Sequence, residues 1–138
     1  VGIYFYTYAL TKEDAYNQAM WVIEQIKPYD VSLPIAFDFE DWQYFSKKSL
    51  SIHDINEIAT HFMDTIEDNG YKGMNYSSKY YLENIWNIDK YPVWLAHYTK
   101  KTDYKGKYAM WQLCNDGRIS GINGAVDINI IYESLWYN

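Results

Sequence analysis

The segment Leu33-Pro-Ile-Ala-Phe-Asp38-Phe-Glu40 governs how the rest of the chain is interpreted. A proline suits the first residue of a strand, and the apolar run after it is typical of a buried strand. Because side chains alternate along a strand, Asp38 and Glu40 point to the same side, roughly 6.6 Å apart along the backbone. Neighbouring carboxylates repel and raise one pKa, which favours acid–base chemistry at the strand end. The alternative is a solvated strand end whose two acids face a loop.

The chain on either side of this strand alternates between strand and helix patterns. Residues 1–9 are β-branched and aromatic, which predicts a strand with Tyr6 and its alternate neighbours on one face. Thr11 and Ser51 are each predicted to cap a helix, because an acid follows three residues later and apolar residues recur at helical spacing. Residues 41–50, between the key strand and the second helix, are predicted to form a polar and aromatic loop.

The second half of the chain consists mainly of strand patterns. Strands are predicted at residues 72–77, 91–98, 107–114 and 125–131, with a short helix or turn at 79–88 and a turn around 115–117. Alternating βα units predict an α/β fold with a parallel sheet, in which functional groups gather at the C-terminal ends of strands. The candidate residues at or near such predicted ends are Asp38, Glu40, Tyr76, Tyr98 and Asp127.

Composition restricts the class of protein. At 138 residues the chain has the size of a single domain with a real core. Aromatic residues make up 20% of it, and flat rings with a polar handle suit sugar rings as well as a core. The net charge of −6 argues against nucleic acid as a partner, and no apolar run approaches the length of a membrane span. One cysteine and three scattered histidines give no metal-ligand pattern, so neither a metal nor a cofactor is predicted.

Six short segments carry a family resemblance when they are taken together. They are Val1-Gly-Ile-Tyr-Phe-Tyr, Leu33-Pro-Ile-Ala-Phe-Asp-Phe-Glu, Gly73-Met-Asn-Tyr-Ser-Ser, Pro92-Val-Trp-Leu-Ala-His-Tyr, Met110-Trp-Gln and Gly124-Ala-Val-Asp-Ile-Asn. In this order the chain resembles the glycoside hydrolase family 25 muramidases, the Chalaropsis-type lysozymes. The resemblance implies one catalytic domain over residues 1–138 with an irregular, TIM-like β/α barrel that is expected to be partial. It also implies cleavage of the β-1,4 bond between N-acetylmuramic acid and N-acetylglucosamine in bacterial peptidoglycan, outside the cell, by an autolysin or a phage endolysin.

The resemblance assigns roles to single residues. Glu40 matches the family's general acid. Asp38 matches the acid that steers the substrate's 2-acetamido group, whose oxygen attacks in place of a protein nucleophile. Asp127 matches a third acid of the site. The residues that match the substrate groove are Tyr76, Trp94, Tyr98 and Gln112, with Tyr6 added from the first strand; core packing is the alternative for the first four. A spacing of roughly 6.6 Å leaves retention or inversion open.

The chain departs from the family at its beginning. Family members carry Asp-Val-Ser on the first strand, and the only such run here, Asp30-Val31-Ser32, lies between the first helix and the key strand. Because a closed barrel takes about 200 residues or more, the family's first two βα units are expected to be missing. The first and last strands lack the charges that protect sheet edges, so each is expected to pair with an N-terminal fragment or a second copy. A non-catalytic glycan-binding module and a chitinase-like hydrolase remain alternative functions.

Overall fold

A computed structural model describes residues 1–132 of the chain, which form one six-stranded sheet with helices packed on it. The elements in chain order are β1 Ile3–Tyr6, α1 Lys12–Ile26, β2 Ile35–Asp38, α2 Trp42–Lys47, α3 Ile52–Asp68, β3 Gly73–Ser78, α4 Lys79–Asn84, β4 Val93–Ala96, β5 Met110–Gly117 and β6 Val126–Ile131. The strands lie in the sheet in chain order. Strands β1 to β5 are parallel and β6 is antiparallel to β5.

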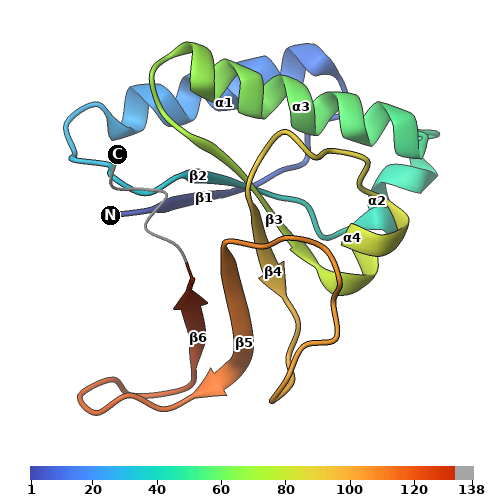
Figure 1. Cartoon of the computed structure of the whole chain (residues 1–138). Helices are drawn as coiled ribbons and strands as arrows, with labels where there is room; N and C mark the ends of the chain where they lie inside the picture. Colours follow the sequence, from blue (N-terminus) through green and yellow to red (C-terminus); the bar gives the residue numbers. More distant parts are fainter. Residues whose placement is uncertain (133–138) are drawn as a thin grey trace.

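The sheet is a curled half-barrel, which confirms the predicted α/β class and its partial, TIM-like form. In Figure 1 the strands β4, β5 and β6 turn away from the plane of β1 and β2. Strands β1 and β6 are the two edges, and each pairs with one strand within residues 1–132.

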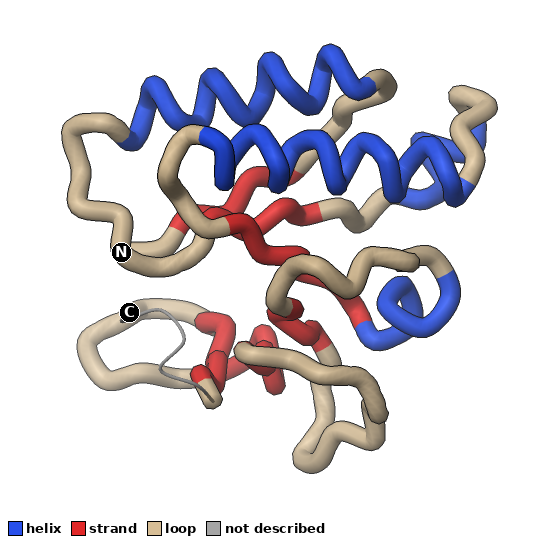
Figure 2. Tube along the Cα trace, turned by 45° about the horizontal axis from the view of Figure 1, so that its top comes forward, coloured by secondary structure: helices blue, strands red, loops and turns tan. Residues whose placement is uncertain are grey.

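The two long helices cover the outer face of the first three strands. Figures 1 and 2 show α1 and α3 side by side over β1, β2 and β3. Both caps form as predicted, because the hydroxyls of Thr11 and Ser51 accept the N–H groups of Asp14 and Asp54 at 3.0 and 3.1 Å. The apolar stripes of both helices are buried against the sheet, where the ring of Phe37 lies 5.3 Å from that of Phe62. This packing fixes β2, whose C-terminal end carries the acids.

The segment after β2 was wrongly predicted to be a loop over its whole length, because residues 42–47 form α2. The side chain of Asp41 caps this helix by accepting the N–H of Tyr44 at 2.9 Å. Phe45 is buried, and its ring lies 4.7 Å from the ring of Phe39. A short helix without a long apolar stripe is stabilised by these contacts, which the local pattern does not reveal.

The hairpin between the last two strands also differs from the prediction. Strand β5 continues through Gly117, where a Cβ atom would lie only 2.4 Å from Cγ1 of Ile128, so this glycine permits close strand approach. The turn follows, with Gly121 and Gly124 at φ values of 89° and 113°. Asp127 was wrongly placed near a C-terminal strand end. It lies at the start of β6, and it reaches the same edge of the sheet because β6 is antiparallel.

Candidate active site

Three site residues lie in register across the first three strands. Tyr6 of β1 pairs with Asp38 of β2, and Asp38 pairs with Tyr76 of β3. Each is at or near the C-terminal end of its strand, as the parallel sheet predicts. Tyr6 is partly exposed, and its pKa is raised to about 12 by burial first and then by Tyr8 and the two acids. The phenol therefore stays neutral beside Asp38, and its hydroxyl interacts with that of Tyr8.

The acids Asp38 and Glu40 lie close enough for the charge of one to change the pKa of the other. Asp38 is only 4% exposed, whereas Glu40, two residues beyond it, is exposed. Burial, the negative charge of Glu40 and the hydrogen bond between the two carboxyl groups raise the pKa of Asp38 to about 8. At neutral pH Asp38 therefore holds its proton. The strand ends at Asp38, and the backbone rise between the residues therefore does not set the carboxyl spacing.

Buried contacts on both sides hold the backbone that carries Glu40. The ring of Phe39 is buried and lies 5.4 Å from that of Trp86. From α4, the hydroxyl of Tyr81 donates a hydrogen bond to the carbonyl of Glu40 at 2.7 Å and accepts the N–H of Trp42 at 3.4 Å. Tyr81 therefore links Glu40 to Trp42, the first residue of α2, while the side chain of Glu40 remains exposed.

Gln112 connects the aromatic wall to the third acid. Its Oε1 accepts hydrogen bonds from the hydroxyls of Tyr76 and Tyr98 at 2.7 and 2.9 Å. Its Nε2 donates to Oδ2 of Asp127 at 3.1 Å. A carboxylate only accepts, so the amide must present its NH₂ to Asp127 and its oxygen to the tyrosines. Gln112 is buried, and it orients three site residues rather than forming exposed groove surface.

Trp94 lies below this wall on the concave face of the sheet. Its ring meets Tyr76 edge to face at 4.8 Å and packs on the cluster of Ala36, Met74, Ala109 and Met110. Its Nε1 donates to Oδ1 of Asn129 at 2.9 Å. Trp94 thus supports Tyr76 from beneath while it remains half-buried.

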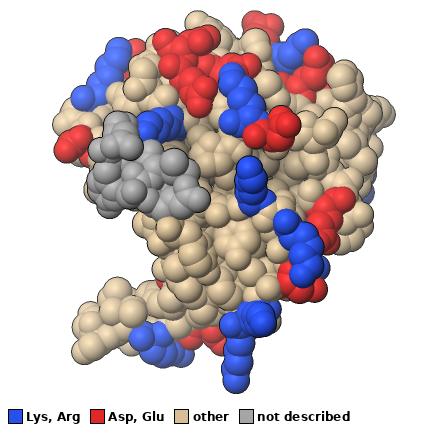
Figure 3. Space-filling model, viewed as in Figure 1, with Lys and Arg blue, Asp and Glu red and all other residues tan. Residues whose placement is uncertain are grey.

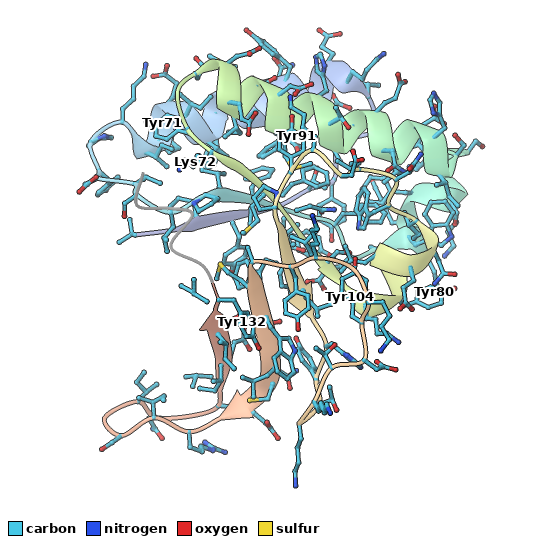
Figure 4. The ribbon with its side chains drawn as sticks, in the orientation of Figure 1. Tyr71, Lys72, Tyr80, Tyr91, Tyr104 and Tyr132 are labelled. Carbon is cyan, nitrogen blue, oxygen red and sulfur yellow. The ribbon has the colours of Figure 1, made fainter. Side chains whose placement is uncertain are left out.

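A cavity of about 600 Å³ opens beside Glu40, Tyr76 and Tyr98. The residues of this wall that sequence reasoning did not select include Lys79, Tyr80, Tyr81, Glu83 and His97. Most of them come from α4, and Figure 4 labels Tyr80 on this helix. The sequence signal for them was Ser78, which ends the Gly73-Met-Asn-Tyr-Ser-Ser motif and caps α4 by accepting the N–H of Tyr81 at 3.2 Å.

The family model of the glycosyl hydrolases family 25 matches residues 1–122, and it bears out the resemblance on which these roles rest. The chain belongs to glycosyl hydrolase family 25. A curated relative, the uncharacterized protein YegX of Escherichia coli strain K12, is 27% identical over 130 residues, which are 91% of this chain and 46% of YegX. The family 25 chain therefore spans about half the length of this relative.

Solved structures share the fold of this family 25 chain. The modular autolysin LytC from Streptococcus pneumoniae, in complex with a synthetic peptidoglycan ligand, matches with a TM-score of 0.78 and 31% identity over 94% of this chain and 33% of LytC. The Clostridium perfringens spore cortex lytic enzyme SleM matches with a TM-score of 0.79 at 20% identity, over 97% of this chain and 50% of SleM. At that identity the second likeness concerns the fold alone.

The described residues, 1–132, contain neither a candidate metal site nor a candidate membrane-spanning helix. Within residues 1–132, the side chains of His, Cys, Asp and Glu form no group of three that could hold a metal ion. In that range no helix has both the length and the apolar character needed to cross a membrane.

Proposed function

We propose that the chain is a peptidoglycan hydrolase that acts at the bacterial cell wall and cleaves the β-1,4 bond between N-acetylmuramic acid and N-acetylglucosamine. The observation that carries this proposal is the Asp38–Glu40 pair, in which a buried acid of raised pKa lies behind an exposed acid that lines a tyrosine-lined cavity. Membership of glycosyl hydrolase family 25 supports glycoside hydrolysis, and the similarity to LytC, an autolysin in complex with a synthetic peptidoglycan ligand, supports the wall as its place of action.

The two acids have different roles because Glu40 is exposed and Asp38 is buried. Glu40 faces the cavity and, as the general acid, donates a proton to the glycosidic oxygen as the bond to the leaving sugar breaks. Asp38, buried behind it, accepts the N–H of the substrate's 2-acetamido group, whose carbonyl oxygen attacks the anomeric carbon. Water then opens the cyclic intermediate, and Glu40 takes the proton back. Tyr76 and Tyr98, fixed by Gln112, form the wall against which the sugar lies.

Lysis of purified cell walls by two matched variants tests this assignment. Glu40→Gln keeps the size of the side chain and removes the proton, so turnover is expected to fall by about 10²- to 10⁴-fold. Glu83→Gln is the control, because it makes the same change in the same cavity at a carboxylate that pairs with Lys79. It is expected to lyse walls at close to the wild-type rate. Equal rates for Glu40→Gln and wild type would remove Glu40 from the acid role.

A glycan-binding module without turnover is the second candidate. It is favoured by β1, which brings the neutral Tyr6 and no carboxylate to the side of Asp38. Sedimentation of the protein with insoluble walls, without any release of soluble fragments over a long incubation, would support this candidate over the hydrolase.

A further inference from the structure

A second cavity lies at the opposite edge of the sheet from the acids. It has a volume of about 950 Å³, and its floor includes Gly73, Val93 and Ala109, at or beside the starts of β3, β4 and β5. Tyrosines contribute much of its wall. We call it the tyrosine groove, defined by Tyr91, Tyr104 and Tyr108.

The rings of the groove form a connected row. The centroids of Tyr104 and Tyr108 are 6.1 Å apart, and those of Tyr108 and Tyr132 are 5.5 Å apart. Tyr132 is 49% exposed, so the row ends at the surface. Tyr104 lies against the backbone of Gly106, where a Cβ atom would come within 2.2 Å of its Oη. A side chain at position 106 would therefore collide with the hydroxyl end of the Tyr104 ring, so glycine leaves room for the ring in this position.

The connection between β4 and β5 contributes residues to both the groove and the catalytic cavity. Burial raises the pKa of Tyr104, and the charge of Glu83, a residue of the first cavity, adds to this effect. Tyr104 and Tyr98 also belong to the same connection between β4 and β5. In Figure 4 Tyr104 appears between Tyr80 of the first cavity and Tyr132 at the far end of the row. Glu83 of the first cavity therefore lies near enough to Tyr104 of the groove for its charge to act on the phenol.

Among the described residues that line the groove, Lys107 is a cation that a ligand can reach. Lys90 pairs with Asp64 and also lies 3.8 Å from Glu67. Lys107, by contrast, is exposed and has no carboxylate partner within residues 1–132. Figure 3 shows the same face, on which separate charged side chains surround a largely uncharged centre. In a chain of net charge −6, an unpaired lysine beside tyrosine rings suits a glycan that bears carboxylates.

We propose that the tyrosine groove is a second binding site for an amino-sugar polymer with carboxylate side groups, and that it holds the strand whose bond is cleaved in the first cavity. The polymer's class rests on the proposed function. Apolar sugar faces would lie on Tyr104 and Tyr108, and Lys107 would meet a carboxylate of a lactyl group or stem peptide. The site adds affinity for long strands and leaves the chemistry of the Asp38–Glu40 pair unchanged.

Sedimentation with insoluble peptidoglycan tests the groove separately from catalysis. All proteins carry Glu40→Gln so that the wall stays intact, and Tyr104→Ala or Lys107→Ala is added. Loss of the contact area of one ring is expected to weaken binding about tenfold. The control is Tyr16→Ala, which removes a tyrosine that is exposed on α1. It is expected to bind like the Glu40→Gln parent.

Turnover by the otherwise wild-type enzyme gives the second readout. Tyr104→Ala and Lys107→Ala are expected to raise KM for the polymer and to leave kcat on a soluble disaccharide-repeat tetramer unchanged. If wild type cleaves no substrate, the proposed function fails while the sedimentation result still decides the groove.

Three outcomes overturn the groove. In the first, Tyr104→Ala and Lys107→Ala bind the wall as well as the Glu40→Gln parent does. In the second, the two variants lose as much turnover on the tetramer as on the polymer. In the third, the protein self-associates and Tyr132→Ala abolishes this association. Circular dichroism checks folding; if Tyr104→Ala is unfolded, the exposed Lys107→Ala decides alone.

Discussion

Replacing Asp38 with asparagine should make the protein more stable at alkaline pH. The carboxyl of Asp38 is 4% exposed, and its pKa is raised from 3.8 to about 8 by burial and by Glu40. The folded state therefore binds this proton more tightly than the unfolded state. The resulting contribution to stability is fully present below about pH 4 and is lost as the pH rises toward 8. Asparagine imitates the neutral acid and does not ionise.

The size of the effect follows from the pKa difference. A difference of 8 − 3.8 = 4.2 units corresponds to an upper limit of about 6 kcal/mol at about 1.4 kcal/mol per unit. Even a quarter of this limit, about 1.5 kcal/mol, exceeds the error of a denaturant titration. The buried Oδ1 of Asp38 has no hydrogen-bond partner among the described residues, so ionisation leaves its charge without compensation at that atom.

Urea unfolding of wild type and Asp38→Asn at pH 5, 6, 7 and 8 measures the prediction. The difference in unfolding free energy is expected to grow with pH in favour of the variant. Asp68→Asn, at an exposed carboxylate at the end of α3, is the control, and its difference from wild type should be constant. A constant difference for Asp38→Asn as well, or a variant less stable than wild type at pH 8, would refute the raised pKa of Asp38.

Three further predictions follow from the same geometry. Wall lysis should decline as the pH rises through about 8, because Asp38 then loses its proton and places a second negative charge beside Glu40; a constant rate up to pH 10 would contradict this. Tyr81→Phe removes the hydrogen bonds to the Glu40 carbonyl and from the Trp42 N–H and should lower kcat about tenfold, more than KM changes, whereas Tyr80→Phe should not. The open edges β1 and β6 predict association, so sedimentation velocity should reveal species heavier than 16.5 kDa; a fully active 16.5 kDa monomer at all concentrations would count against it.

The local signals in the sequence were sufficient where each element is determined by its own residues. Thr11 and Ser51 cap α1 and α3 because the cap and its acid lie three residues apart. The strand that ends at Asp38 was evident from its proline and apolar run. In both cases the decisive contacts span only a few residues of chain.

The missed features depend on contacts between distant segments. The α2 helix requires Phe45 to pack on Phe39, and the direction of β6 depends on a hairpin that closes after Gly117. Motif matching placed Gln112 in the substrate groove of the active site. Its buried position between two tyrosines and Asp127 follows only from the curl of the sheet. Tyr81 reaches the Glu40 backbone from α4, 41 residues along the chain, and no spacing rule connects the two.

The central claim is tested most directly by the new reducing end that appears when the purified chain acts on peptidoglycan. After borohydride reduction and acid hydrolysis, mass spectrometry distinguishes reduced muramic acid from reduced glucosamine. Cleavage on the muramic acid side, through the acids Asp38 and Glu40, predicts that reduced muramic acid accumulates with time and that Glu40→Gln yields none. Accumulation of reduced glucosamine, or an undiminished signal from Glu40→Gln, would contradict the account.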